Sequence, residues 1–157
     1  MSAQTVGRQL GLLHRLPVEQ AIQPADPRWV RRRLLTYQQV AGIPAMRTFT
    51  DRDAYACAKG EPLRPDAAGE AHTGLPGSRL TVPLVFVDPA RCGTRALAET
   101  VVAHEVTHAR YLSLGHSQRF FDRVQELLDG VAAQENRLGA GPATTVALTL
   151  LRRAVVA

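Results

Sequence analysis

The chain has 157 residues, of which 45% are hydrophobic and 21% are charged. This length suits one domain with a single core, and the composition is that of an ordinary globular protein. No stretch approaches the ~18 consecutive apolar residues that a membrane-spanning helix needs, so the sequence predicts no membrane partner. The formal net charge is +5, and it comes almost entirely from arginine, because Lys59 is the only lysine.

The arginines are densest at Arg31–Arg33, one helical turn after Arg28. Positive charge attracts nucleic acids and acidic substrates, but the solvated face of a helix looks the same in a sequence. Nucleic acid therefore stays an open partner.

The first residues of the chain, 1–16, lack the continuous apolar segment and the cleavage site of a signal peptide. The chain has two cysteines, Cys57 and Cys92. In a protein without an export signal, they indicate free thiols in a reducing compartment. We therefore expect a cytoplasmic protein.

Two helices are predicted in the first part of the chain. Residues 5–16 place apolar side chains at helical spacing. Further on, Asp26 and Pro27 form a typical helix start, with the carboxylate as N-cap and the proline in the first turn. This helix should run to about Val40 and end at Gly42. Its arginines should face solvent and its apolar side chains the core; the apolar set is Trp29, Val30, Leu34, Leu35, Tyr37 and Val40.

The middle of the chain is predicted to form a small sheet. Residues 45–50 alternate as a strand does, whereas residues 51–60 fit a short helix or a second strand. A hairpin is expected from residues 68–73 and 79–87, joined by a glycine-rich turn. Pro83 lacks a backbone N–H, so we expect residues 79–87 to be an edge strand. An extended peptide can bind to such an edge through main-chain hydrogen bonds.

Helices are predicted again after the hairpin. Residues 94–114 have apolar side chains at helical spacing and are followed by Gly115, a natural helix stop. Ser117 is a suitable N-cap for a helix over residues 118–130, and a last apolar helix is expected over residues 144–155. The apolar positions of the first of these helices are Leu97, Val101, Val102, Val106, Ala109 and Leu112.

Within the helix predicted over residues 94–114, His104, Glu105 and His108 form the stretch H-E-V-T-H. Two histidines four positions apart lie on the same side of a helix, one turn from each other, and can hold one Zn²⁺. The glutamate can then accept a proton from a metal-activated water. The pattern is typical of zinc hydrolases, and most simply of a peptidase.

A third ligand is needed, and two residues compete for the position. The metzincin spacing is excluded, because Tyr111 and Leu114 stand where that class has glycine and histidine. Glu126 could act as the downstream glutamate of a thermolysin-type site. We favour His116, since a turn at Gly115 can fold it back towards the motif, and Glu126 stays the alternative.

The run H-E-V-T-H-A-R-Y-L-S-L-G-H-S-Q-R-F-F resembles the core of SprT-like metallopeptidases. The resemblance covers residues 68–131, under half of the chain. It implies that His104, His108 and His116 are zinc ligands, that Glu105 is the catalytic base and that Phe120 is a core aromatic. It also implies a β-hairpin before the active-site helix. The chain lacks the C-x-x-C pairs of the zinc ribbon that many members carry.

Together these features predict a small α+β, zincin-like single domain over residues 1–157. Its metallopeptidase core covers about residues 68–131, with N-terminal helices over 5–42 and a C-terminal helix over 144–155. The active-site helix should pack on a short sheet with an edge strand that binds a protein or peptide substrate.

The expected activity is zinc-dependent hydrolysis of peptide bonds by a metal-activated water, with Glu105 as general base. Two alternatives stay open: a non-catalytic zinc-stabilised adaptor and a nucleic-acid-associated domain. Oxyanion-stabilising donors are not fixed by the sequence; the candidates are His72, Arg79 and Tyr111.

Overall fold

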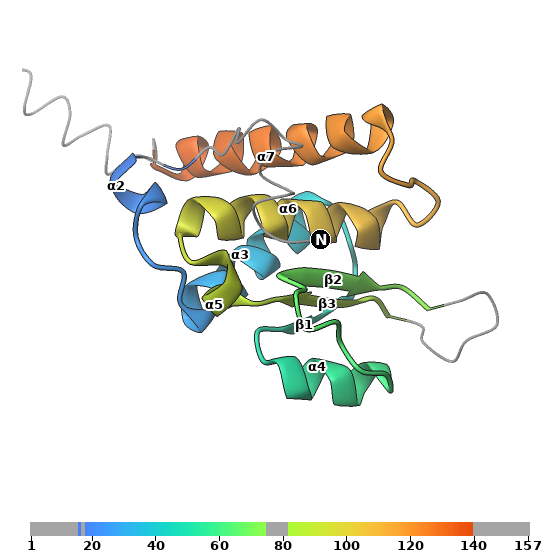
Figure 1. Cartoon of the computed structure of the whole chain (residues 1–157). Helices are drawn as coiled ribbons and strands as arrows, with labels where there is room; N and C mark the ends of the chain where they lie inside the picture. Colours follow the sequence, from blue (N-terminus) through green and yellow to red (C-terminus); the bar gives the residue numbers. More distant parts are fainter. Residues whose placement is uncertain (1–15, 17, 75–81, 140–157) are drawn as a thin grey trace, which may run out of the picture.

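The computed structural model describes residue 16 and residues 18–74 and 82–139. They form an α+β fold, as predicted, in which helices cover both faces of a three-stranded sheet (Figure 1). Apart from residue 16, the helices predicted over residues 5–16 and 144–155 lie outside the described residues. The elements are α2 (Val18–Ala21), α3 (Pro27–Val40), β1 (Arg47–Phe49), α4 (Arg52–Lys59), β2 (Gly69–His72), β3 (Leu84–Val87), α5 (Pro89–Cys92), α6 (Arg95–Arg110) and α7 (Gln118–Gly139).

Helix α3 begins where the sequence predicts. The Asp26 carboxylate accepts a hydrogen bond of 2.9 Å from the backbone N–H of Trp29, and Pro27 occupies the first turn. The predicted apolar face is buried except at Val40, which is half-buried, and at Leu35, which is 54% exposed. That prediction was wrong because Leu35 lies beyond the edge of the buried stripe.

Arg33 also departs from the prediction that the arginines of α3 face solvent, since it is buried. Its Nε donates a hydrogen bond of 2.7 Å to Glu99 of α6, and a second guanidinium nitrogen pairs with the other oxygen of the same carboxylate. Tyr37 donates a hydrogen bond of 2.6 Å to Glu99, and Glu135 of α7 also pairs with Arg33. A buried ion pair therefore joins three helices.

The sheet has the order β1-β3-β2, with β1 parallel and β2 antiparallel to β3. The expected edge strand over residues 79–87 is thus wrong, because in the sheet that the described residues form β3 is central and β2 is an edge. Pro83 is tolerated because it lies just before β3, where only its carbonyl is used, accepting a 2.9 Å hydrogen bond from Arg47.

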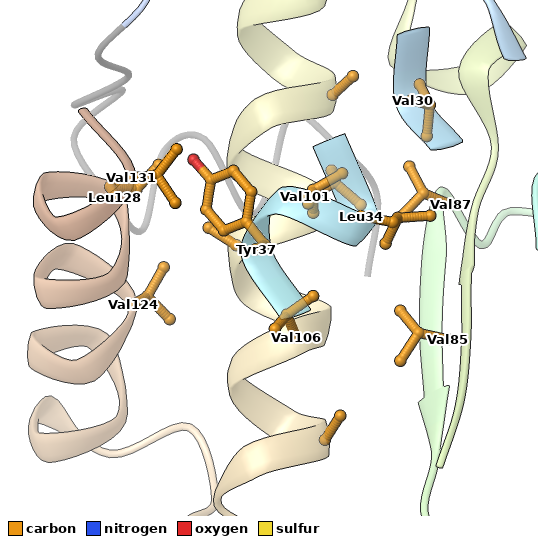
Figure 2. Close-up of a cluster of buried hydrophobic side chains, with 14 of the residues drawn as sticks. Val30, Leu34, Tyr37, Val85, Val87, Val101, Val106, Val124, Leu128 and Val131 are labelled. Atoms are coloured by element: carbon orange, nitrogen blue, oxygen red, sulfur yellow. The ribbon is translucent and has the colours of Figure 1, made fainter. Parts of the chain in front are cut away.

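The two faces of β3 belong to two clusters of buried side chains. Leu84 and Phe86 pack against Tyr55 of α4. Val85 and Val87 point to the opposite face, where they join the main core formed with α3, α6 and α7 (Figure 2). This alternation is the normal consequence of the pleated strand. It leaves all four residues of β3 buried and fixes the sheet beneath α6.

Residues 51–60, which the sequence left open between helix and strand, form α4. Asp51 caps the helix by accepting a 2.7 Å hydrogen bond from the N–H of Ala54, and Gly60 ends it in a left-handed conformation with φ 81°. Helix α6 ends at Arg110, earlier than predicted, and Leu112 beyond it is 66% exposed.

Helix α7 begins after Ser117, as predicted, but continues past Gly130. A Cβ at Gly130 would lie 3.2 Å from a methyl group of Val40, so this glycine allows α7 to pack closely on the end of α3. None of the helices formed by the described residues is long and apolar enough to span a membrane.

Candidate metal centre

The structure brings the side chains of three histidines together, two from α6 and one from the segment before α7. The Nε2 atom of His104 lies 3.1 Å from that of His108 and 3.1 Å from that of His116. The remaining Nε2–Nε2 distance, from His108 to His116, is 3.0 Å. His116 therefore lies beside the motif histidines, as predicted.

Hydrogen bonding alone cannot account for this triangle of nitrogens. Each neutral imidazole nitrogen is either a donor or an acceptor, never both. Among three nitrogens in mutual contact, at least two must have the same role, so at least one of the three close pairs is repulsive. A shared cation removes the conflict, because all three lone pairs can then point at it.

The ligand set fits a metal ion. A tetrahedral zinc site with Zn–N bonds of about 2.0–2.1 Å separates its nitrogens by roughly 3.3–3.4 Å, close to the observed distances. Burial lowers the pKa of His104 to about 3 and that of His108 to about 4, so both rings are unprotonated at neutral pH. These three histidines are the group of His, Cys, Asp and Glu side chains that could bind a metal within the described part of the chain.

The segment between α6 and α7 determines where His116 lies. The N–H of Tyr111 donates to Thr107 over 2.9 Å at the end of α6, and the chain then turns. Ser117 starts α7 by accepting hydrogen bonds from the backbone of the first turn, including one of 3.0 Å from Phe120 N–H to its carbonyl. The turn therefore returns His116 to the helix face that carries the other two rings.

Phe120 packs against all three imidazoles. It is fully buried. The centroid of its ring lies 4.3 Å from that of His108, in a stacked arrangement, and 4.9 Å from that of His104, edge to face. The Nδ1 atom of His104 is buried and has no hydrogen-bond partner among the described residues. The orientation of this ring is therefore fixed by aromatic packing, which agrees with the core role expected of Phe120.

Glu105 lines the same cavity as the three histidines, and this cavity has a volume of about 350 Å³. The residue is only 6% exposed. Burial raises the pKa of its carboxyl to about 8, and the nearby Glu70 adds to the rise, whereas a hydrogen bond from the backbone N–H of Ala71 lowers it. A divalent cation beside Glu105 would favour the ionised form.

Gly69 lets β2 approach α6 closely, a feature that sequence reasoning missed. A Cβ at this position would lie 2.6 Å from Cγ1 of Val101 and 2.8 Å from Cγ of Glu105. Only glycine fits so close a contact. A glycine within a predicted strand is the available signal, because it often marks the close approach of another element.

The remaining wall of the cavity comes from residues that the motif does not include. Arg64 precedes β2, Glu70 belongs to it, Thr73 follows it, and the exposed Leu112 lies beyond α6. No periodic pattern in the sequence connects these positions, because a loop, an edge strand and a turn bring them together.

The alternative third ligand, Glu126, lies elsewhere. Its carboxylate pairs with Arg123 at 2.6 Å, and both residues line a separate cavity of about 170 Å³. Tyr111, a candidate oxyanion donor, lines that second cavity too. His72 ends β2 but does not line the histidine cavity, and Arg79 lies outside the described residues.

Comparisons with protein-family models, curated proteins and solved structures found no match to this chain. The likeness of residues 104–121 to SprT-like peptidases therefore stays a resemblance of motif and spacing. The functional argument rests on the geometry of the site.

Proposed function

We propose that this chain is a zinc-dependent peptidase in which Glu105 is the general base. The observation that carries the proposal is that Glu105 shares one cavity with three histidines whose Nε2 atoms lie 3.0–3.1 Å apart. A catalytic zinc site of this kind has three protein ligands and a carboxylate beside them.

Imidazole nitrogens are good ligands for zinc, as they are for copper, iron and nickel, and zinc is the metal that we propose. When bound, zinc supplies a Lewis acid that favours attack of water on a carbonyl group. The Glu105 carboxylate is placed to take the proton of the attacking water and then to pass it to the leaving amine. His104 and His108 stay unprotonated at neutral pH, which keeps their Nε2 atoms available as ligands.

The substrate we propose is an extended peptide. Strand β2 is an edge of the sheet formed by the described residues, and Gly69, Glu70 and Ala71 line the histidine cavity. A peptide that adds to this edge by main-chain hydrogen bonds would pass along the cavity. Such binding depends little on side chains, so an unfolded segment of many sequences can serve as substrate.

A purely structural zinc site is the competing function. Structural sites are usually closed by four protein ligands. Within the described residues, the metal-binding group has three members, and Glu105 lies beside it in an open cavity. Both observations favour catalysis. We also propose a cytoplasmic location, in which the thiols of Cys57 and Cys92 would stay free.

Removal and return of the metal tests this proposal. Purified protein should cleave an unfolded protein substrate, lose this activity when a chelator removes the zinc, and regain it with about one equivalent of zinc per chain. Full activity in protein shown to be free of metal would refute the proposal. Absence of cleavage by the zinc-loaded protein, across several unfolded substrates, would favour the structural function.

A further inference from the structure

The loop between α4 and β2 is held in place by one side chain, Arg52. Its guanidinium donates to the backbone carbonyls of Arg64 at 2.7 Å, Pro65 at 3.3 Å and Ala67 at 2.9 Å. It also donates to the carboxylate of Asp88, after β3, at 2.8 Å. Three carbonyls bound to one guanidinium, with a proline beside Arg64, give the loop a fixed backbone where it meets the histidine cavity.

This loop brings the side chain of Arg64 to the wall of the histidine cavity. Glu105 and the three histidines line the same cavity, so Arg64 lies near the proposed general base. Because Arg52 binds the backbone carbonyl of Arg64 and not its side chain, the Arg64 side chain is left for other contacts.

Arg64 has no ion-pair partner among the described residues. The other acidic residue of the cavity wall, Glu70, already has partners, since it pairs with Lys59 and accepts a 3.1 Å hydrogen bond from the hydroxyl of Tyr55. Of the described residues that line the cavity, Arg64 is therefore the one with a guanidinium or ammonium group, and it lies on a fixed loop near the residue that we propose as general base.

We propose that Arg64 determines specificity by binding a carboxylate group of the substrate close to the scissile peptide bond. A guanidinium binds a carboxylate through two parallel hydrogen bonds, so it recognises shape as well as charge. The carboxylate can come from an aspartate or glutamate side chain or from a free C-terminus. This inference rests on the proposed peptidase function.

Pairs of peptides test the inference. Cleavage sites are first mapped in an unfolded protein with the zinc-loaded enzyme, and a peptide is built around one site. For each position around the scissile bond, two variants of this peptide are compared, one with glutamate and one with glutamine at that position. Each variant is made with a free and with an amidated C-terminus. At one position, or at the free C-terminus, the carboxylate should raise kcat/KM about tenfold, the size of a partly exposed charge-assisted hydrogen bond.

Variants of the enzyme assign this preference to the side chain. Arg64→Gln should bring the ratio of kcat/KM between acidic and neutral peptides close to one, and Arg64→Glu should favour a peptide with lysine at the same position. Arg31→Gln removes an exposed arginine of α3 and should keep the wild-type ratio. Zinc content and thermal unfolding show that each variant is folded.

The outcomes separate this inference from the proposed function. A wild-type enzyme that cleaves peptides without an acidic preference, or a preference that survives Arg64→Gln, would overturn the inference and leave the peptidase standing. Equal losses on acidic and neutral peptides in Arg64→Gln would overturn it too, because they would indicate a catalytic or structural effect. No cleavage of any peptide would overturn the proposed function and the inference with it.

Discussion

Gly69 of β2 lies so close to Glu105 of α6 that a Cβ on the glycine would sit 2.8 Å from Cγ of the glutamate. This contact brings the N–H of Ala71 within hydrogen-bonding reach of the Glu105 carboxylate. The absence of a side chain at Gly69 therefore allows the edge strand to lie directly against the proposed general base.

Gly69→Ala should consequently disturb the site more than the fold. The added methyl group meets Val101 and Glu105, and overpacking of this kind costs about 1–3 kcal/mol of unfolding free energy. We expect zinc binding to persist, because the histidines lie on other elements, while kcat/KM falls at least about tenfold as Glu105 moves. Gly139→Ala, where a methyl group meets no atom within 4 Å, is the control. Wild-type activity in Gly69→Ala would show that the contact is unimportant.

Phe120 should be needed for metal affinity. Its ring packs on the imidazoles of His104 and His108, and no hydrogen bond from a described residue orients Nδ1 of His104. Phe120→Leu should therefore weaken zinc binding about tenfold or more, as changes to groups that orient metal ligands do. Competition with a chromogenic chelator measures the affinity.

Phe86→Leu is the matched control, since Phe86 is equally buried but packs with Tyr55 on the other face of the sheet. It should lose stability without losing zinc affinity. An equal loss of affinity in the two variants would mean that general destabilisation, and not the orientation of the rings, is responsible.

The buried pair of Arg33 and Glu99 should contribute to stability in a way that a surface pair does not. Glu99→Gln leaves the Arg33 charge buried with Glu135 as its one acidic partner among the described residues, so we expect a loss of about 3–5 kcal/mol of unfolding free energy. Arg33→Met combined with Glu99→Leu should recover much of that loss, because the one carboxylate that then loses its partner, Glu135, is exposed to solvent. Denaturant titration of the single and double variants measures both effects.

The exposed pair of Arg123 and Glu126 is the comparison for that experiment. Glu126→Gln should change stability by less than about 1 kcal/mol, as exposed pairs do. If Glu99→Gln were equally mild, the buried pair would not join the helices as we describe.

The two thiols should differ in reactivity. Burial raises the pKa of Cys92 to about 12, whereas Cys57 is exposed. A disulfide-exchange reagent at pH 8 should thus react quickly with one thiol in the native protein and with two after denaturation. Because the folded pKa of Cys92 exceeds that of an unfolded thiol, its contribution to stability is full below pH ~8.5 and declines as the pH rises. Rapid reaction of both native thiols would contradict the burial of Cys92.

The sequence predicted those features that depend on neighbours along the chain. A capping pattern predicted the start of α3 at Asp26 and Pro27. Turn residues predicted the antiparallel pairing of β2 with β3, and ligand spacing predicted that His116 returns to the motif after Gly115. The same local reasoning misplaced Pro83 in an edge strand, because it could not show that β1 pairs with β3.

Contacts between positions far apart in the chain could not be predicted from the sequence. Arg33 was expected in solvent because its partner, Glu99, lies on a helix much later in the chain. Likewise, the place of Arg64 beside the histidines depends on the hydrogen bonds that Arg52 makes to its loop. Tertiary packing decides such positions, and it leaves no periodic pattern in the sequence.

The most direct test of the proposed function compares Glu105→Gln with Glu126→Gln, each against the wild type, in zinc content and in cleavage of an unfolded protein. All three proteins should hold one zinc ion per chain, since the three histidines are intact. Glu105→Gln should lower kcat/KM by about 100-fold or more, because glutamine cannot accept the proton of water. Glu126→Gln should cleave as the wild type does. Cleavage by Glu105→Gln at the wild-type rate, with equal zinc, would contradict the assignment of Glu105 as general base.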